Sequence, residues 1–425
     1  MLDLKFIRDN KELVKEGIKN RGYKLDIDEL LKLDEEHRKM LAQVEELRSK
    51  RNKANDEIAA AMKAKRNAKE IIESMKPVSQ KIADLESKVE EFNQKIDKIK
   101  YIIPNIPDKS LPVGGPENNK IVRSWGKNPT FEFNPKNHID LAESLDIICF
   151  GTAAKITGSN FILYKGLGAR LERALINFML DMHTKKHGYT EILPPFLVNR
   201  RSMTGTGQLP KLEEDMYRLK DEDLFLIPTA EVPVTNIHSG EVLEESQLPI
   251  RYAAYSACFR REAGSYGKDT RGLIRIHQFD KVELVKFAKP ETSFDELEKL
   301  LNDAEDVLQA LKLPYRVVML ATGDISFAAA KCYDIELYAA GTDAYLEVSS
   351  CSCFTDFQAR RANIRYRDSK TKKTNFVHTL NGSGVALARL VVAILENYQN
   401  KDGSVNIPEA LVPYMDGINV IAKAL

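Results

Sequence analysis

Cysteine is scarce in this sequence, with five residues in a chain of 425, and an odd number leaves at least one without a disulfide partner. A framework of disulfides is therefore excluded, and the pattern favours reduced thiols and a cytoplasmic location. Long apolar runs are absent too, because no stretch approaches the roughly 18 residues that cross a membrane. The first residues, MLDLKFIRDN, carry acids among the apolar residues and lack the core of a signal peptide. We therefore expect neither a secreted protein nor a membrane partner.

Excess charge of either sign is also missing. Lys and Arg number 63 and Asp and Glu number 62, which gives a formal net charge of +1. The balance argues against a protein coated in basic charge, and it leaves room for a local basic patch. What remains is an ordinary globular composition, 43% hydrophobic, in a length that corresponds to two or three domains at about 150 residues each.

A heptad pattern of apolar residues runs through the N-terminal quarter of the chain. The first series, spaced alternately three and four apart, comprises Leu30, Leu33, His37, Met40, Val44, Leu47, Arg51, Ala54, Ile58 and Ala61. The second comprises Ile71, Met75, Val78, Ile82, Leu85, Val89, Phe92, Ile96, Ile99 and Ile103. The two series predict two long helices that pair as an antiparallel coiled-coil hairpin. Helices of about 35 residues would reach roughly 50 Å, with Pro77 delaying or bending the second one.

Basic residues gather at the expected tip of this hairpin. Between residues 48 and 69 there are eight basic and two acidic residues, a local net charge of +6. One interpretation is the solvated surface of a coiled coil, and the other is a basic arm that binds a phosphate backbone through shape and charge. On the second interpretation, the residues that contact nucleic acid are Arg48, Lys50, Arg51, Lys53, Lys63, Lys65 and Arg66.

A stretch rich in proline and glycine, IIPNIPDKSLPVGGPENN, follows the heptads and is typical of a linker. We therefore expect an N-terminal domain with the coiled-coil arm over residues 1–105 and a linker over residues 106–130. A domain of mixed α and β structure would then occupy residues 131–425.

Periodicity within this last domain predicts both helices and strands. A strand interrupted by Pro194 and Pro195 opens a stretch with many aromatic and β-branched residues, which runs through Phe287 and favours strands. Apolar residues recur at helical spacing in three other places. The predicted helices span residues 166–188, 291–311 and 385–399.

The stretch from Phe259 to Phe287, FRREAGSYGKDTRGLIRIHQFDKVELVKF, has the most informative pattern. It ends a strand with Arg260 and Glu262, continues through the glycine-rich loop GSYGKDTRG, and returns with alternating apolar and polar residues, as an antiparallel strand does. The chain contains no GxxxxGK[ST] P-loop and no dinucleotide-binding glycine pattern after a strand. The two common nucleotide-binding loops are therefore excluded.

This stretch resembles motif 2 of the class II aminoacyl-tRNA synthetases, in the version found in the seryl-tRNA synthetase family. NGSGVALARLVVAILENYQ, with Arg389, resembles motif 3, and the helix before Gly188 together with the Pro194–Pro195 strand resembles motif 1. TGTGQLPKLEEDMY, PTAEVPVTN and EVSSCSCFTDFQARR are also similar to segments of that family. The resemblance implies an α+β fold: a class II antiparallel sheet core flanked by helices, with an N-terminal antiparallel two-helix coiled-coil arm. It also implies a homodimer that binds ATP on the sheet, which fits the missing P-loop.

The activity implied by the resemblance is the ligation of serine to tRNA. L-serine is activated with ATP to seryl-adenylate and transferred to the 3′ end of tRNA-Ser, and of tRNA-Sec where that tRNA exists. The serine carboxylate attacks the α-phosphorus of ATP, so charge grows on phosphoryl oxygens, and fixed guanidinium groups and metal ions suit this chemistry.

The resemblance assigns catalytic roles to four residues. Arg260 resembles the arginine that contacts the α-phosphate, Arg275 the one near the terminal phosphates, and Arg389 the one that holds the γ-phosphate. Glu262 would accept a hydrogen bond from the adenine amino group. Taken singly, each arginine is more typical of a surface ion pair, but three at these spacings around a glycine-rich loop favour the functional interpretation.

The remaining ATP contacts follow from the same resemblance. Phe279 would stack on adenine, although an aromatic residue on a strand is as typical of a core. Glu347 and Ser350 resemble ligands of the Mg²⁺ that bridges the ATP phosphates. The expected ATP-binding set is Arg260, Arg261, Glu262, Arg275, Phe279, Glu347, Val348, Ser349, Ser350 and Arg389, of which Arg261 has no role of its own.

Serine selection needs a small pocket with a carboxylate for the ammonium group and partners for the hydroxyl. Thr229 and Glu231 resemble residues at the serine site of the family, Glu283 resembles the carboxylate that faces the hydroxyl and ammonium groups, and Ser383 matches the motif 3 position near the hydroxyl. Taken singly, Thr229 is typical of a turn and Glu283 of an exposed strand position. The expected serine-binding set is Thr229, Ala230, Glu231, Arg260, Glu283 and Ser383.

Cys351 and Cys353 form a CxC pair that lacks a matching histidine or second cysteine pair, which is a weak pattern for zinc. A rare archaeal form of seryl-tRNA synthetase uses a catalytic zinc, but its arm and core differ from those of this sequence. We expect reduced, structural cysteines, no structural zinc, and ATP with Mg²⁺ as the cofactors.

Three alternatives keep the fold and change the function. Synthetase-like proteins that load amino acids onto carrier proteins lack the tRNA arm, which this chain has. Non-catalytic RNA-binding paralogues usually lose motif 2 or motif 3 residues, which are present here. Another class II amino acid is disfavoured by the arm and by the TAE, EVSS and NGSG segments.

Overall fold

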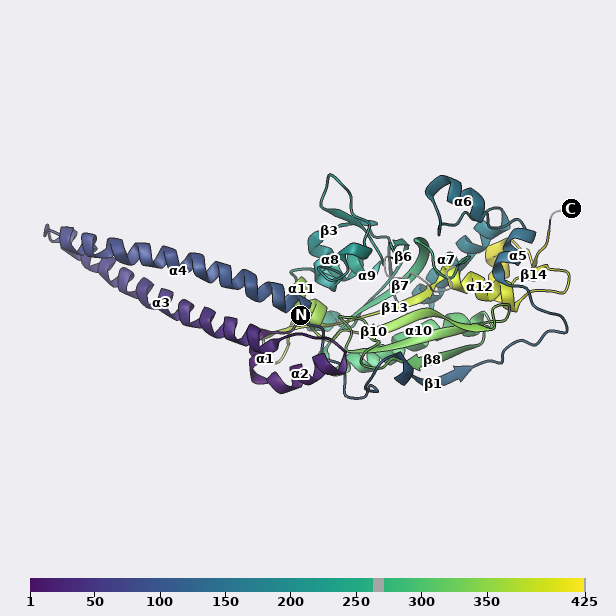
Figure 1. Cartoon of the computed structure of the whole chain (residues 1–425), viewed down its shortest axis with the longest axis horizontal. Coiled ribbons are helices and arrows are strands. Elements are labelled where there is room, and N and C mark those ends of the chain that lie inside the picture. Colours follow the sequence, from purple (N-terminus) through teal and green to yellow (C-terminus); the bar gives the residue numbers. More distant parts are fainter. Residues whose placement is uncertain (263–270, 424–425) are drawn as a thin grey trace. The chain divides into compact units, whose positions relative to one another are not determined.

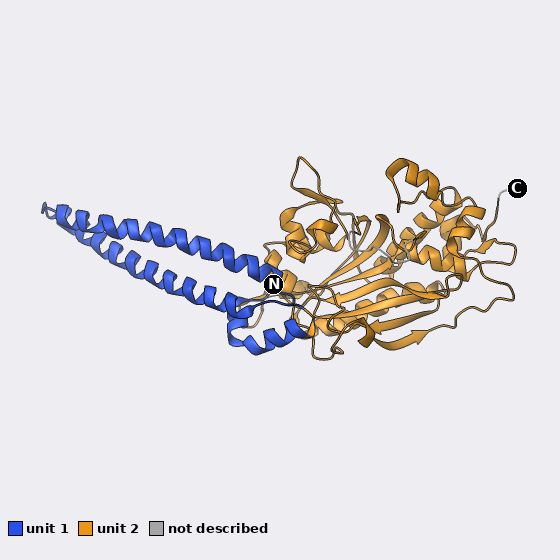
Figure 2. Ribbon diagram, viewed as in Figure 1, with its two compact units in different colours: residues 1–19, 23–104 blue, residues 20–22, 105–425 orange. Residues whose placement is uncertain are grey.

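The computed structural model describes residues 1–262 and 271–423, and most of the predicted glycine-rich loop lies outside the described residues. The chain divides into two compact units, drawn in blue and orange in Figure 2. The domain boundaries expected at residues 105 and 130 stay predictions. Unit 1 comprises residues 1–19 and 23–104, and unit 2 comprises residues 20–22 and 105–425.

Unit 1, which is described in full, consists of two short and two long helices (Figure 1). The long helices α3 (Ile27–Lys63) and α4 (Lys69–Ile102) pack along each other and are joined by residues 64–68. All twenty predicted heptad positions are buried or half-buried, whereas most residues between them are exposed. The predicted antiparallel hairpin is therefore confirmed. The short helices are α1 (Leu4–Asp9) and α2 (Lys11–Asn20).

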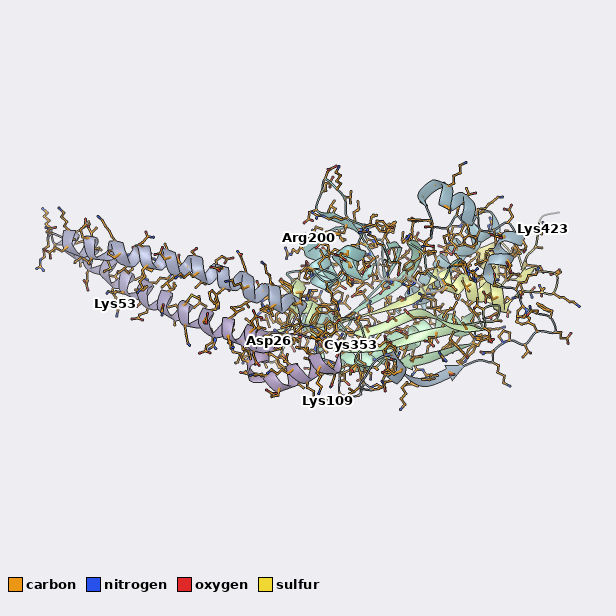
Figure 3. The ribbon with its side chains drawn as sticks, viewed as in Figure 1. Asp26, Lys53, Lys109, Arg200, Cys353 and Lys423 are labelled. Carbon is orange, nitrogen blue, oxygen red and sulfur yellow. The ribbon has the colours of Figure 1, made fainter. Side chains whose placement is uncertain are left out.

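Local chemistry explains where the long helices begin. The side chain of Asp26, labelled in Figure 3, accepts hydrogen bonds from the backbone N–H groups of Asp28 and Glu29 and so caps α3. The delayed start predicted from Pro77 is wrong, because α4 begins at Lys69 and continues through the proline. Pro77 and Glu73, whose carbonyl loses its helical partner, are both exposed, so water can satisfy that carbonyl.

Unit 2 is built around a sheet that has eight strands among the described residues (Figure 1). All neighbouring strands are antiparallel except the edge pair β2 and β6. This sheet, with its flanking helices, confirms the predicted α+β fold. From edge to edge the strands are β1 (Lys120–Trp125), β8 (Tyr315–Met319), β9 (Lys331–Ala339), β10 (Ala344–Cys353), β13 (His378–Ala386), β7 (Gln278–Ala288), β6 (Ile250–Phe259) and β2 (Thr190–Ile192).

Three helices cover one face of this sheet and are called the helix layer below. Their apolar side chains share one large buried cluster with strand residues such as Leu284 of β7. They confirm the three helices predicted from periodicity, within a few residues at each end. They are α7 (Leu167–Lys185), α10 (Ser293–Ala310) and α12 (Leu387–Asn397).

Alternation along β7 separates the two faces of the sheet. Val282 and Leu284 pack into the helix layer, whereas Val285 and Phe287 belong to a second cluster with two short helices. Because successive side chains of a strand point to opposite faces, Glu283 and its odd-numbered neighbours point away from the helix layer. The two short helices are α9 (Glu231–Thr235) and α11 (Phe357–Ala362).

Smaller elements complete unit 2. The strand predicted to break at Pro194 and Pro195 is divided into β2 and β3, and the interval predicted as a linker supplies the edge strand β1. Within the described ranges, no helix combines the length and apolar character needed to span a bilayer. The elements not yet named are α5 (His138–Ser144), α6 (Phe150–Thr157), α8 (Arg200–Thr206), β3 (Leu197–Asn199), β4 (Leu224–Leu226), β5 (Val242–Glu244), β11 (Arg365–Arg367), β12 (Thr374–Phe376), β14 (Val405–Asn406) and β15 (Val420–Ile421).

Candidate active site

A cavity of about 620 Å³ in unit 2 is lined by strands β7, β10 and β13 together with residues from segments 206–216 and 326–328. The residues that β7 contributes are odd-numbered, so the cavity lies on the sheet face opposite the helix layer. Tertiary structure here gathers predicted residues from distant parts of the sequence, and their individual roles stay predictions. Those that line the cavity are Thr229, Glu231, Arg260, Glu262, Arg275, Phe279, Glu283, Glu347, Val348, Ser350, Ser383 and Arg389.

Three predicted residues do not line the cavity. Ala230 is fully buried in the cluster with α9 and α11. Arg261 is exposed, and its guanidinium donates to the carbonyl of Glu214 at 3.1 Å. Ser349 is buried, and its Oγ donates to the carbonyl of Ser383 at 2.6 Å. These three residues are neighbours of the site rather than part of its surface.

Two β-bulges aim side chains at the cavity. The pairing of β10 with β9 shifts between Glu347 and Ser349, and the pairing of β13 with β7 shifts between Ser383 and Val385. A bulge inserts one unpaired residue and re-aims the side chains beside it. The hydrogen bond from Ser349 to Ser383 joins the two bulges. The positions of Glu347 and Ser383 therefore depend on irregularities in the sheet.

The segment NGSG places polar side chains toward the cavity and glycines toward the helix layer. Asn381 and Ser383 line the cavity. A Cβ on Gly382 would come within 2.2 Å of a leucine of α10, and one on Gly384 within 2.7 Å of Nε2 of His183 on α7. The helices approach β13 so closely that these two positions have no room for a side chain.

Arg260 follows directly after β6 and is held by two contacts. Its guanidinium carbon lies 5.2 Å from the centroid of the Phe279 ring, and its Nε donates to the carbonyl of Pro228 at 3.4 Å. A cation over an aromatic face is attracted by the ring quadrupole. A fixed positive charge beside an aromatic face suits a nucleotide, which combines anionic phosphates with a planar base.

Arg275 and Arg389 each lie beside a glutamate of the cavity. Arg275 forms an ion pair with Glu262. Arg389 donates to the carbonyl of Glu347 at 2.5 Å, and the carboxylate of the same glutamate lies 3.6 Å away. Both arginines are partly exposed, so their charges remain accessible to a bound anion. The cavity thus collects three guanidinium groups.

Glu283 is the most deeply buried carboxylate of the cavity, with an exposed fraction of 0%. Nζ of Lys281 lies 2.5 Å from one carboxylate oxygen and also donates to Oγ1 of Thr229 at 2.9 Å. The side-chain amide of Asn381 donates to the other oxygen at 3.0 Å. The charge of Lys281 compensates the buried carboxylate, while Oε2 has no well-aligned hydrogen-bond donor within the described residues. The result is a small polar pocket in which the ammonium group of Lys281 contacts both a carboxylate and a hydroxyl.

Glu231 is a second buried carboxylate of the cavity. Burial, and then the charge of Glu283, raise the pKa of Glu231 to about 7. Its Oε1 accepts a hydrogen bond of 2.6 Å from Gln358, whose amide oxygen accepts one of 2.7 Å from Thr379. The charge on Glu231 therefore changes within the range of physiological pH.

Lys281, Asn381 and Gln358 were missed from the sequence. Two of them carried a signal, because Lys281 precedes Glu283, and Asn381 precedes Ser383, by two residues. Side chains two apart on a strand share a face. Gln358 on α11 gave no local signal, since its contact with Glu231 joins residues 127 apart in the chain.

Oxygen ligands for a cation are grouped around Glu347 and Ser350. Ser350 pairs with Asp334 across β10 and β9. Burial, and then the charge of Glu347, raise the pKa of Asp334 well above its usual range. The described residues contain no group of three or more His, Cys, Asp or Glu side chains arranged to hold a metal ion. Carboxylate and hydroxyl oxygens suit Mg²⁺, which commonly completes its shell with substrate phosphates.

The five cysteines are free thiols. Cys351 and Cys353 lie on β10, and Cys353 is labelled in Figure 3. Burial raises the pKa of Cys351 to about 12 and that of Cys353 to about 11. A thiolate is the form that binds metal, and this environment disfavours it.

The arm places its predicted basic residues on an open surface of unit 1. Arg48 is exposed as well, but it forms an ion pair of 2.7 Å with Glu86 across the hairpin. The others have no ion pair within the described chain, and all but the half-buried Arg51 are exposed. Lys53 is labelled in Figure 3. The basic residues without an ion pair are Lys50, Arg51, Lys53, Lys63, Lys65 and Arg66.

Comparison with known proteins identifies both units. A family model described as the tRNA synthetase class II core domain (G, H, P, S and T) matches residues 214–398, which supply most of the cavity lining. The sheet and its cavity are thus the core of a class II synthetase. A second family model, described as the seryl-tRNA synthetase N-terminal domain, matches residues 1–107, which contain the arm.

Individual relatives agree with both family models over the whole length. The serine–tRNA ligase of Geotalea uraniireducens is 56% identical over 423 residues, which cover 99% of this chain and 100% of that protein. The structure of seryl-tRNA synthetase from Pyrococcus horikoshii complexed with ATP is 41% identical, with a TM-score of 0.92 and full coverage of both chains. That of cytoplasmic serine–tRNA ligase from Naegleria fowleri with AMP is 29% identical, with a TM-score of 0.88 over 100% of this chain and 99% of that one. The chain belongs to the seryl-tRNA synthetase family.

Proposed function

We propose that this chain activates L-serine with ATP to seryl-adenylate and transfers serine to the 3′ end of tRNA-Ser, and to tRNA-Sec where it is present. One observation carries the proposal: a single cavity combines three guanidinium groups with a buried pocket in which Lys281 contacts both the carboxylate of Glu283 and the hydroxyl of Thr229. The guanidinium groups suit a triphosphate, and the pocket suits a small substrate with an ammonium and a hydroxyl group.

The residues would divide the chemistry as follows. Arg260, Arg275 and Arg389 hold the phosphates and stabilise the charge that grows on the α-phosphoryl oxygens as the serine carboxylate attacks. Phe279 stacks on adenine, next to Glu262. The arginines are already held by neighbours, so little reorganisation is needed during the reaction.

Serine would be held by the buried carboxylates and their neighbours. Glu231 and Glu283 attract the ammonium group, and Thr229 and Ser383 lie close enough to contact the substrate. A site built to hydrogen-bond a hydroxyl rejects alanine, which lacks one, by a factor on the order of 10⁴. Glycine is rejected for the same reason.

Mg²⁺ fits the oxygen ligands of Glu347 and Ser350, and when bound it would neutralise charge on the ATP phosphates. The arm would recognise the shape and charge of the tRNA backbone through its six basic residues without an ion pair. We also propose a homodimer, as in the family, and a cytoplasmic location, which suits free cysteines.

Serine-dependent ATP–pyrophosphate exchange, followed by charging of total tRNA, tests the proposal. We expect exchange with serine and at most traces with threonine, alanine and glycine, and then charging with serine. Exchange without charging would point to a carrier-protein acceptor. Exchange that prefers threonine, or no exchange with any amino acid from a folded sample, would contradict the serine assignment or the catalytic one.

We expect the KM for serine to depend on pH through Glu231. The pKa of this residue is raised to about 7, so the free protein carries a neutral Glu231 below that pH and an anionic one above it. The ammonium group of serine prefers the anion. Lowering the pH from 8 to 6 should therefore raise the KM for serine about tenfold, the effect of one proton that must be released on binding. Glu231→Gln should bind serine weakly at both pH values, and a flat profile in the wild type would contradict this role.

A further inference from the structure

His183 lies near the C-terminal end of α7, fully buried in the helix layer behind β13. A Cβ on Gly384 would come 2.7 Å from Nε2 of His183 and 3.3 Å from the carbonyl of Val282. The edge of the imidazole therefore rests against the backbone of Gly384. This glycine lies inside the bulge between Ser383 and Val385.

Two side chains, each anchored to an aspartate, hold the His183 ring in place. Its Nδ1 is 3.0 Å from Nδ1 of His187, whose Nε2 is 2.9 Å from a carboxylate oxygen of Asp306. Tyr189 packs edge-on against the ring at 5.8 Å between centroids, and it is anchored through its hydroxyl to Asp303. A carboxylate only accepts, so His187 donates from Nε2. His187 and Tyr189 therefore fix the position of the His183 ring.

The ring acts as a spacer rather than as a charged group. Burial, and then the neighbouring His187, lower the pKa of His183 to about 3, so this ring is neutral at physiological pH. Its Nε2 makes no well-aligned hydrogen bond within the described chain. Contact of the ring edge with Gly384 is therefore what His183 contributes to the strand.

Two hydrogen bonds connect the braced strand with the cavity. The carbonyl of Ser383 accepts from Ser349, which links the two bulges at 2.6 Å. Asn381 of the same strand donates to Glu283 at 3.0 Å. A shift of the Gly384 backbone would displace the side chains of Ser383 and Asn381, and both line the cavity.

We propose that His183 is a positioning residue for the amino-acid substrate, because it braces the Gly384 backbone from the opposite face of the sheet and so fixes Ser383 and Asn381. It does not line the cavity, so it acts only through β13. The inference rests on the proposed function, since serine is the substrate that these two side chains would contact.

The first test compares His183→Ala with Met179→Ala in the full-length chain. Met179 lies one helical turn earlier on α7 and is equally buried, so each variant removes a buried side chain from the same helix. We expect both to lower the melting temperature. Only His183→Ala should raise the KM for serine, on the order of tenfold, with the KM for ATP within about twofold. The readout is serine-dependent ATP–pyrophosphate exchange.

Gly384→Ala provides the reciprocal test. Its added methyl group would collide with the His183 ring, while the backbone at this position is not in the left-handed region and accepts alanine. In a His183→Ala background the collision with the ring is removed, and only the 3.3 Å approach to the carbonyl of Val282 remains. We expect Gly384→Ala alone to raise the KM for serine, and the double variant to recover a large part of that loss.

An unchanged KM for serine in His183→Ala would overturn the proposal, as would a double variant with a KM no lower than that of the worse single variant. A similar rise of KM in Met179→Ala would also overturn it, because the effect would then be general softening of the core. Exchange by the wild type distinguishes failure of the proposed function from failure of the role proposed for His183. If it shows no exchange with serine, the proposed function fails, and calorimetric titration of serine into the same proteins decides the role of His183.

Discussion

Replacing Arg260 by alanine should lower kcat/KM for serine-dependent ATP–pyrophosphate exchange by about 10²–10³, the usual effect of removing one pre-oriented group that stabilises transition-state charge. Arg260 is held by the Phe279 ring and the Pro228 carbonyl before any ligand binds. Its fork of donors is thus already positioned for a phosphoryl or carboxylate oxygen. Arg260→Lys should restore little, because an ammonium group is a point charge without that planar fork.

The neighbouring residue supplies a matched control. Arg261 has the same charge and lies one position further along the chain, but it is exposed and donates to the Glu214 carbonyl outside the cavity. Arg261→Ala should keep exchange within about twofold of the wild type. Equal losses in the two variants, with melting temperatures unchanged, would contradict the assignment of Arg260 to the reacting phosphate.

Shortening the arm should abolish the charging of tRNA and spare the activation of serine. The ion pair between Arg48 and Glu86 shows which positions of α3 and α4 face each other. Replacing residues 49–85 by a short glycine-containing turn therefore ends both helices at facing positions. This variant lacks all six basic residues of the arm that have no ion pair. We expect kcat/KM for tRNA to fall by about 10³ or more, and exchange to stay within about twofold. Equal loss of both activities would contradict this division of labour.

Charge and shape of the arm can be separated by point variants. Converting the six basic residues without an ion pair to glutamine keeps both helices. It should lower kcat/KM for tRNA charging at physiological salt and make this value less dependent on salt concentration. The control converts three lysines whose charge is already matched by a glutamate on the same helix. These are Lys39, Lys76 and Lys95, paired with Glu35, Glu73 and Glu91. An equal effect of both sets would indicate loss of general charge rather than of a binding surface.

Local patterns in the sequence determined the helical hairpin of this protein and the faces of its strands. The twenty heptad positions predicted the hairpin because a helix repeats its faces every few residues, whatever the rest of the chain does. Alternation along the strand of residues 278–288 likewise determined which side chains face the cavity, and it would have located Lys281 beside Glu283. The resemblance of motif segments to a family supplied the roles of Arg260, Glu283 and Arg389, which periodicity alone does not give.

Only the tertiary structure decided the details of the site. The bulge at Ser383, the contact of Gln358 with Glu231, and the contact of His183 with Gly384 each join segments far apart in the chain. A local pattern records which face a side chain takes, whereas these features depend on how closely the helix layer and neighbouring strands approach one another. Packing of that kind is a property of the assembled sheet, so the sequence determined the faces and the tertiary structure determined the distances between them.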